Sequence, residues 1–233
     1  MLFHSEEKCD LSIIMPCLNE DKTVGACVDE AFKYISKHKL NGEIIVVDNG
    51  STDDSFFVAK KHGAKVVRES VKGYGRAIRT GISNCSGKVI IIGDCDTTYD
   101  FLDLDSFYYP LINDEYDFMI GNRFNMKMEK GAMPISHKLG VPFLSSCGRM
   151  KYKVSVNDFH SGLRAVTRQA ASQMEFNTDG MEFATEMVAV AAALGCRIGQ
   201  VDITLRKCEY DRKSKLRTIR DGFRHLKYIL KGN

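Results

Sequence analysis

The sequence predicts an α/β fold built on a doubly wound, mostly parallel sheet. Short β-branched apolar runs alternate with segments of helical periodicity through the first half of the chain. The runs are apolar throughout, which is typical of parallel strands that are buried on both faces. Polar loops rich in Asp, Asn and Gly follow several of them, as expected at the edge where such sheets bind ligands.

The elements of the first half follow in order. A strand is expected at 11–15, and in the next helix, at 22–38, apolar side chains such as Val24, Val28 and Ile35 recur at helical spacing. The same alternation then continues. Further strands are expected at 43–47, 64–68 and 89–93, and further helices at 54–62 and 75–85.

The second half of the chain has a weaker pattern. A stretch rich in Met, Lys and Gly, at 125–137, is expected to form a loop. Because no repeat, low-complexity block or linker interrupts the chain, we expect one domain over 1–233 with a C-terminal appendage. Its remaining strands are expected at 118–120, 162–166 and 197–205, and its helices at 141–152, 181–194 and 215–231.

The composition excludes several classes of protein. With 44% hydrophobic and 27% charged residues the chain is globular, and a net charge of +3 is too small to indicate a nucleic-acid partner. The eight cysteines include no C-x-x-C pair, which favours a reducing cytosol over a zinc ribbon or disulfide scaffold. We find no secretory signal at the start, and the longest nearly apolar segment, 187–194, is too short to span a bilayer.

Two carboxylates, Asp94 and Asp96, close the apolar strand at 89–93. Along an extended backbone they point to one side and Cys95 points to the other. Mg²⁺ typically takes one or two protein carboxylates together with substrate phosphates, so the pair indicates a site for a metal and a diphosphate. The alternative is an acidic turn without a ligand, since Asp is common in turns.

Three further loops belong to the same predicted edge. Those at 16–20 and 48–53 follow the first two strands, and their polar groups suit a base and a ribose, although helix capping is the alternative, above all for Asp53. The third, at 72–76, is not a dinucleotide fingerprint, because Ile78 stands at the third glycine position. Its backbone N–H groups can still hold a phosphate or sugar hydroxyls. The chain contains no P-loop motif.

Several ordered motifs together resemble family 2 glycosyltransferases of the GT-A fold. They are Ile14-Met-Pro-Cys-Leu-Asn-Glu20, Val46-Val-Asp-Asn-Gly-Ser-Thr-Asp53, Gly73-Tyr-Gly-Arg-Ala77, Gly93-Asp-Cys-Asp96 and Gly121-Asn-Arg-Phe124. Later stretches are similar to the dolichyl- or polyprenyl-phosphate hexose synthase branch of that family. These are Asp158-Phe-His-Ser-Gly-Leu-Arg-Ala165, Gly180-Met-Glu-Phe-Ala-Thr-Glu-Met187 and Ser214-Lys-Leu-Arg217.

The resemblance implies an inverting, metal-dependent transfer of a hexose from a nucleotide diphosphate sugar to a polyprenyl or dolichyl phosphate. Asp94 and Asp96 would hold Mg²⁺ or Mn²⁺, and Asp96 would act in catalysis. Residues 10–124 would bind the nucleotide sugar, 125–210 the acceptor, and 211–233 would form a basic tail. The implied donor contacts are Pro16, Leu18, Asn19, Glu20, Asp48, Ser51, Asp53, Lys72, Gly73, Arg76, Asp94, Cys95, Asp96, Arg206 and Lys215.

Two residues bear on the identity of the sugar. Thr98 stands where the mannose synthases of this branch usually have Gln, and Asp100 is an additional carboxylate that could reach the metal or sugar hydroxyls. Both differences favour UDP-glucose over GDP-mannose as the donor.

A phosphate acceptor needs cations more than a general base, because its oxygens are already largely ionised near pH 7. Arg123 and Arg164, which lie among Gly, Asn and Ser beside strands, are the preferred catalytic candidates. The further cations, for which a solvated surface is the alternative, are Arg206, Arg212, Lys213 and Lys215. For a hydroxyl acceptor, Asp158 is the candidate base. His160 is either a phosphate contact or a packed neutral side chain.

The C-terminal segment has the pattern of a basic amphipathic helix. Its apolar stripe is Leu216, Ile219, Phe223, Leu226 and Leu230, and Arg217, Arg220, Arg224, Lys227 and Lys231 occupy much of the rest. Such a helix is typical of a membrane surface, the alternative being a helix packed on the domain. We therefore expect a cytoplasmic protein, peripheral on the cytoplasmic face of a membrane and attached through this helix or through a membrane-protein partner.

Two other functions remain open from the sequence. The same fold and donor could serve transfer to a glycan hydroxyl in the synthesis of a cell-surface polysaccharide. The chain could also be a non-catalytic, nucleotide-sugar-binding subunit of a membrane complex.

Overall fold

One sheet organises the computed structural model, which describes residues 9–124, 128–208, 210 and 218–231. Its strands are β1 (Leu11–Cys17), β2 (Gly42–Asp48), β3 (Lys65–Arg68), β4 (Val89–Ile92), β5 (Phe118–Asn122), β6 (Arg164–Thr167) and β7 (Ile198–Asp202). They lie in the order β3-β2-β1-β4-β6-β5-β7. Neighbouring strands are parallel, except that β6 runs antiparallel to both β4 and β5.

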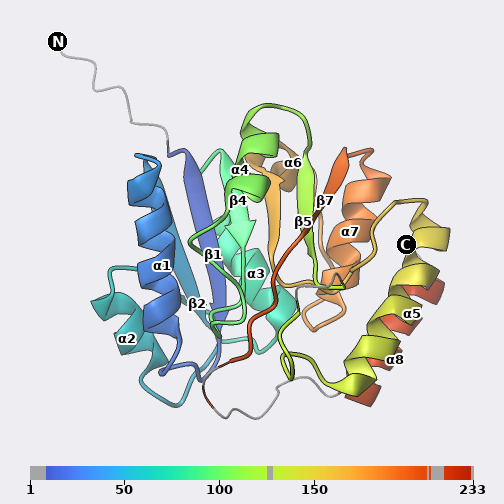
Figure 1. Cartoon of the computed structure of the whole chain (residues 1–233), viewed down its shortest axis with the longest axis horizontal. Coiled ribbons are helices and arrows are strands. Elements are labelled where there is room, and N and C mark those ends of the chain that lie inside the picture. Colours follow the sequence, from blue (N-terminus) through green and yellow to red (C-terminus); the bar gives the residue numbers. More distant parts are fainter. Residues whose placement is uncertain (1–8, 125–127, 209, 211–217, 232–233) are drawn as a thin grey trace.

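Helices cover both faces of the sheet (Figure 1). They are α1 (Val24–Lys37), α2 (Ser55–Lys61), α3 (Tyr74–Ser83), α4 (Asp105–Ile112), α5 (Ile135–Tyr152), α6 (Arg168–Gln173), α7 (Phe183–Ala193) and α8 (Thr218–Lys231). Helices α1, α2 and α4 share one apolar core with the sheet, and α3, α6 and α7 share the other. Helices α5 and α8 pack against each other at one side of the molecule.

The strands supply both cores because successive side chains point to opposite faces. In β1, Ile13 and Met15 are buried in the core with α1, whereas Ile14 is buried in the core with α3. Strand β4 divides Ile91 and Ile92 between the two cores in the same way. Uniformly apolar runs are therefore what this three-layer arrangement requires.

The predicted fold class is confirmed as a doubly wound, mostly parallel sheet with a C-terminal helix. Two helices, α4 and α6, were not predicted. Helix α4 is short and carries Pro110 in its last turn, a residue that usually marks the end of a helix. Helix α5 begins at Ile135, so the loop predicted over 125–137 ends earlier than expected where the chain is described.

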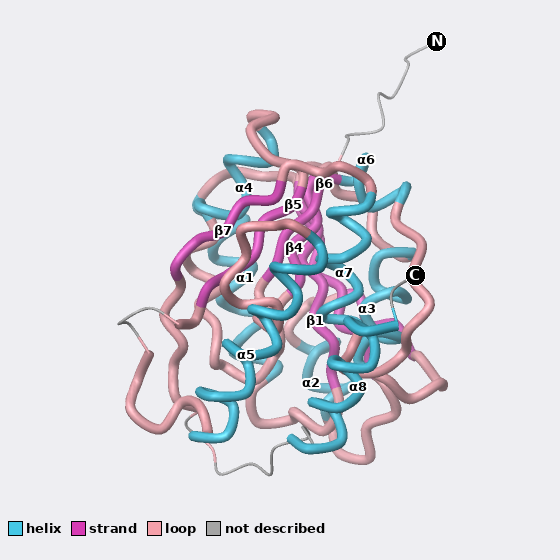
Figure 2. The backbone as a smooth tube through the Cα atoms, turned by 90° about the vertical axis from the view of Figure 1, so that its right-hand side faces the viewer, coloured by secondary structure: helices cyan, strands magenta, loops and turns pink. Residues whose placement is uncertain are grey.

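The C-terminal helix packs through a face that the sequence pattern did not indicate. Asp221, His225 and Ile229 are buried, whereas Phe223 and Leu230 of the predicted apolar stripe are exposed. Figure 2 shows α8 beside α5 on the side of the molecule that faces the viewer. Residues 215–217 of the predicted helix lie outside the described residues. Among the described residues, no helix combines the length and apolar character needed to cross a bilayer.

Candidate active site

A cavity of about 280 Å³ lies at the carboxyl ends of β1, β2 and β4. These strands are adjacent and parallel, so the loops that follow them meet at one edge of the sheet. Eight of the residues proposed from the sequence line this cavity, namely Pro16, Leu18, Glu20, Lys72, Gly73, Asp94, Cys95 and Asp96. Asn49, Tyr74 and Met181 also line it and were not proposed.

The acidic pair is held by the turn that follows β4. Asp96 is buried, and its Oδ1 accepts hydrogen bonds from the backbone N–H of Thr98, at 3.0 Å, and from the Thr98 hydroxyl. Between them Thr97 has φ of 65°, an uncommon conformation for a β-branched residue that costs about 1–3 kcal/mol. The backbone and the hydroxyl of Thr98 thus both support the Asp96 carboxylate.

Asp94 lies against a glycine and two tyrosines. A Cβ placed on Gly162 would come within 2.3 Å of Asp94 Oδ2, so the absence of a side chain there makes room for the carboxylate. The hydroxyl of Tyr74 donates a hydrogen bond to Asp94, and burial together with the Asp94 charge raises the pKa of Tyr74 well above its usual value. Burial also raises the pKa of Tyr99 to about 12. Both phenols stay protonated and able to donate.

The donor set fits a hard divalent cation. Asp94 and Asp96 offer carboxylate oxygens, which Mg²⁺ and Mn²⁺ prefer. The Cys95 thiol is an unsuitable ligand, because a hydrogen bond with Cys17 and burial raise its pKa well above the usual value. Nowhere in the described part of the chain do three or more His, Cys, Asp or Glu side chains gather as a metal site. A cation at this pair would take its other ligands from water and from a bound diphosphate.

The first two loops brace each other. The Ser51 hydroxyl accepts a hydrogen bond from the backbone of Asn19 at 3.0 Å, and Asp48 Oδ1 accepts one from the Ser51 backbone at 3.1 Å. Asp53 accepts from the backbone N–H groups of Asp21 and Ser55, at 3.2 and 3.0 Å. Asp53 therefore joins the two loops to the start of α2, and it does not line the cavity. Neither do Asn19, Asp48 or Ser51.

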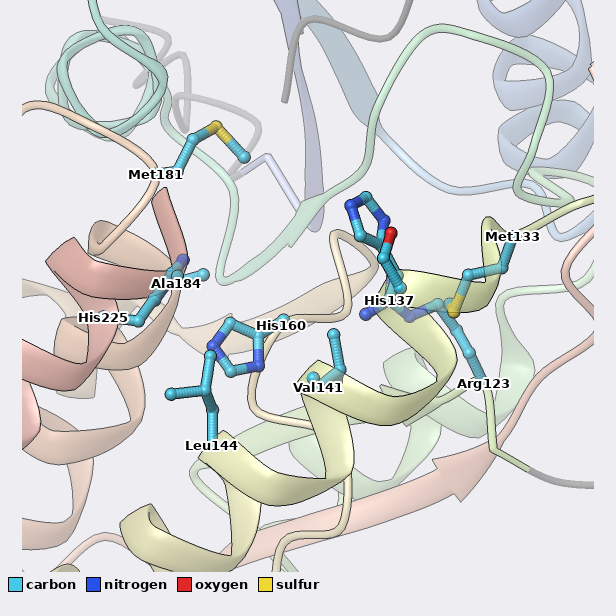
Figure 3. A pocket seen from close by; sticks show the side chains of 12 residues that line it. Arg123, Met133, His137, Val141, Leu144, His160, Met181, Ala184 and His225 are labelled. Carbon is cyan, nitrogen blue, oxygen red and sulfur yellow. The ribbon is translucent and has the colours of Figure 1, made fainter. Parts of the chain in front are cut away.

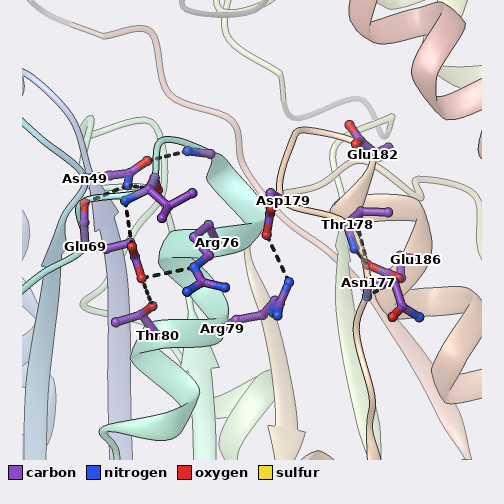
Figure 4. A network of polar contacts seen from close by, with 12 residues as sticks. Asn49, Glu69, Arg76, Arg79, Thr80, Asn177, Thr178, Asp179, Glu182 and Glu186 are labelled. Carbon is purple, nitrogen blue, oxygen red and sulfur yellow. Dashed lines mark hydrogen bonds and ion pairs between the residues drawn. The ribbon is translucent and has the colours of Figure 1, made fainter.

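The glycine-rich loop is positioned by buried polar side chains (Figure 4). Asn49 accepts from the Gly73 backbone at 2.7 Å and donates to the carbonyls of Glu69 and Val71, at 3.1 and 2.8 Å. Arg76 was expected at the donor site, but it pairs with Glu69 at 3.2 Å and does not line the cavity. Asn49 could have been found from the sequence, since it follows Asp48 directly at the end of β2.

A second cavity, of about 110 Å³, lies between α5 and α8 (Figure 3). Apolar side chains, among them Val141 and Leu144, line it together with Arg123 and three histidines. Met181 lines both cavities, so the two adjoin. The second cavity thus offers an apolar wall and a partly buried guanidinium next to the cavity that holds the acidic pair.

Arg123 and Asp158 form a bidentate ion pair. Nε and Nη2 of Arg123 donate to the two carboxylate oxygens at 2.6 and 2.9 Å. The same carboxylate accepts from the backbone N–H groups of Arg123 and His160, at 3.2 and 3.1 Å. Burial alone would lower the pKa of Arg123, but Asp158 more than compensates and raises it. Asp158 is fully buried and engaged in these bonds, which leaves it badly placed to act as a general base.

Arg164, which was expected to contact the acceptor, does not line either cavity. The residue is 2% exposed, and its guanidinium donates to the carbonyls of Ser161, Ala184 and Phe159, at 2.7, 2.6 and 2.6 Å. Because all three nitrogens bind backbone carbonyls, Arg164 joins β6 to α7 and the loop before β6. We correct its expected role to that of a structural residue.

Arg206 and Asp100 also depart from the expectation, because they pair with each other. Arg206 Nη2 lies 2.5 Å from Asp100 Oδ2, and Nη1 lies 3.1 Å from Glu30 Oε1. Neither Arg206 nor Asp100 lines either cavity. Asp100 is therefore not directed to a metal at Asp94 and Asp96. Arg212, Lys213 and Lys215 lie outside the described residues.

The three histidines of the second cavity are neutral at pH 7. Burial is the first cause in each, and nearby arginines add to it. The pKa of His225 falls to about 4, that of His160 falls well below 6.5, and that of His137 is lowered. Thr185 Oγ1 lies 2.8 Å from His225 Nδ1 and 3.4 Å from His160 Nε2. Lowered pKa values make all three weak bases.

Known proteins are similar to this chain both in sequence and in fold. The family model "Glycosyl transferase family 2" matches residues 12–174. The low-salt glycan biosynthesis hexosyltransferase Agl6 of Haloferax volcanii is 33% identical over 221 residues, which are 94% of this chain and 53% of Agl6. This chain therefore spans about half the length of Agl6. A dolichyl-phosphate hexose transferase of the same organism is 28% identical over 85% of this chain and 83% of its own length.

Solved structures show the same architecture. Glucosyl-3-phosphoglycerate synthase from Mycobacterium tuberculosis, solved with Mn²⁺, UDP-glucose and phosphoglyceric acid, superposes with a TM-score of 0.75 at 23% identity. The match covers 95% of this chain and 78% of the synthase. The GT-A fold implied by the sequence motifs is thereby confirmed. Because the family model matches well over half of the chain, the protein belongs to glycosyl transferase family 2.

Proposed function

We propose that the protein transfers a hexose, with inversion, from a nucleotide diphosphate sugar to a polyprenyl or dolichyl phosphate. UDP-glucose is the favoured donor and GDP-mannose the alternative. The nucleotide sugar occupies the cavity at the ends of β1, β2 and β4, with its diphosphate at Asp94 and Asp96. Asp94 and Asp96 would hold a divalent cation there, and such a cation would supply charge to stabilise the leaving diphosphate.

The choice of a phosphate acceptor rests on the lack of a suitable general base among the described side chains of the second cavity. A hydroxyl acceptor needs a base to remove its proton, but Asp158 is held by Arg123 and the histidines have lowered pKa values. A phosphate monoester brings its own ionised oxygens. Arg123, oriented by its pair with Asp158, lines the cavity and offers guanidinium N–H donors to those oxygens, and the apolar wall around Val141 and Leu144 suits a prenyl chain.

His160 supports the same assignment. It lines the second cavity, and its Nδ1 is buried without a hydrogen-bond partner among the described residues. A neutral imidazole can carry a proton on that nitrogen and donate it to a phosphate oxygen. We therefore assign Arg123 and His160 to the acceptor phosphate. The relatives support the class of acceptor, since dolichyl-phosphate transferases are among them.

The test is a transfer assay with labelled UDP-glucose or GDP-mannose, Mn²⁺ and a prenyl phosphate. We expect a labelled lipid product, and we expect Asp96→Asn to lower its rate on the order of 10²-fold or more, because the cation loses a ligand. Asp103→Asn is the matched control, since Asp103 is exposed and lines neither cavity. Transfer to a glycan hydroxyl but not to the lipid would overturn the assignment. Binding of the nucleotide sugar without turnover would instead indicate a binding subunit.

A further inference from the structure

Helix α5 exposes a row of large apolar side chains. Ile135, Leu139 and Phe143 follow at intervals of four residues, so they share one face of the helix. With Met150 they are between 62% and 77% exposed. The opposite face of α5 is buried against the domain through Leu144 and neighbouring small residues. Solvent therefore faces the more apolar side of this helix, which is unusual for a helix that covers a soluble domain.

Helix α8 extends the same surface. It packs alongside α5 in the same direction, since Gly140 and Gly222 line one cavity and Lys151 Nζ lies 3.4 Å from the Leu230 carbonyl. Its outer side presents Phe223 and Leu230, which are 68% and 71% exposed. Figure 2 shows the two helices together on one side of the molecule. We call these six exposed apolar residues, with the exposed side chains around them, the α5–α8 face.

The charged side chains that helices α5 and α8 contribute are mainly basic. Helix α5 contains no Asp or Glu, and the one acidic residue of α8, Asp221, is buried. Arg224 of α8 pairs with Glu182 at 2.8 Å. The other basic residues of the two helices are Lys138, Arg149, Lys151, Arg220, Lys227 and Lys231. An apolar row flanked by cations is complementary to a surface with anionic groups above an apolar layer.

We propose that the α5–α8 face docks on the surface of an anionic lipid bilayer, with the apolar row entering the boundary between headgroups and acyl chains. The inference rests on the proposed function, because the inner sides of the same helices line the acceptor cavity through Val141, Leu144 and Gly222. Docking by this face brings that cavity to the surface where a prenyl phosphate resides. Helix α5 supplies four of the six exposed apolar side chains of the α5–α8 face, and the basic C-terminal helix α8 supplies the other two.

Co-sedimentation with phosphatidylcholine vesicles, with and without phosphatidylglycerol, tests the proposal. We expect the whole chain to bind the anionic vesicles, and to bind less as salt screens the basic residues. Leu139→Asp and Phe143→Asp should each lower the partition coefficient by about tenfold or more, because each removes a large apolar side chain from the boundary. Phe57→Asp is the matched control, since Phe57 is 64% exposed on α2 at the far side of the molecule (Figure 1).

The outcomes separate this inference from the proposed function. With a short, water-soluble prenyl phosphate, Leu139→Asp should retain the wild-type turnover, since Leu139 lines neither cavity. Turnover without vesicle binding overturns the docking face and leaves the reaction intact. Vesicle binding that Leu139→Asp and Phe143→Asp do not reduce also overturns it. A wild-type dimer that either substitution converts to a monomer, in light scattering, assigns the face to a second copy instead.

Discussion

One methyl group placed on Gly162 tests whether Asp94 holds the cation. In Gly162→Ala the new Cβ would lie 2.3 Å from Asp94 Oδ2, 2.9 Å from its Cγ and 3.1 Å from Tyr99 Cε2. The backbone at this position is fixed, because the Gly162 N–H donates to the Tyr99 hydroxyl at 2.8 Å. The carboxylate therefore has to move by about 1 Å, and a displacement of that size costs about 10²-fold in rate, or about 2.7 kcal/mol.

The assay has two parts. Calorimetric titration of UDP in the presence of Mn²⁺ reports the metal site, and initial rates of transfer report the reaction. We expect Gly162→Ala to weaken Mn²⁺-dependent UDP binding and to lower the free energy of unfolding by about 1–3 kcal/mol from overpacking. Gly140→Ala is the control for donor binding and stability, because a Cβ there meets nothing within 4 Å. Unchanged Mn²⁺-dependent binding in a folded Gly162→Ala protein would show that Asp94 is not a ligand.

Two further predictions concern buried charges. In Asp158→Asn the guanidinium of Arg123, which is 13% exposed, loses its fully buried counter-charge. The free energy of unfolding in urea should fall by about 3–5 kcal/mol, and a loss below about 1 kcal/mol would contradict the pairing. His225 has a pKa of about 4 in the fold and near 6.5 when unfolded, so the unfolded chain takes up a proton first as the pH falls. Its share of the stability, at most about 3 kcal/mol, should be present above pH 6.5 and lost between about 6.5 and 4. Urea titrations at several pH values in that range should show that the free energy of unfolding depends less on pH in His225→Asn than in the wild-type protein. An equal pH dependence in the two proteins would contradict the lowered pKa.

The donor side of the site was largely predictable because its geometry depends on local rules. Parallel strands end at a common edge, so the loops after β1, β2 and β4 meet whatever the rest of the chain does. The acidic pair was predictable for the same reason, since Asp94 and Asp96 follow directly on the apolar run that forms β4. The residues missed at this edge, Asn49 and Tyr74, flank residues that were proposed, and Met181 comes from a distant loop.

The roles of the arginines were not predictable, since a charged side chain can choose among many distant partners. Arg123 meets a carboxylate 35 residues away, and Arg206 meets one 176 residues away at Glu30. Arg164 resembles Arg123 in its sequence surroundings, yet it binds backbone carbonyls. Nothing local in the sequence separates these cases, because burial and partner choice arise from packing.

The sequence by itself determined the α/β class, the edge that carries the polar loops and the acidic pair, because strand periodicity and strand ends are properties of short segments. Only the tertiary structure decided that Asp158 pairs with Arg123 and orients it, and that α8 buries His225 and Ile229 while Phe223 faces solvent. A periodic pattern shows that a helix has two faces. Which face is covered depends on the neighbouring helices, and here α5 and α7 cover the face that carries His225.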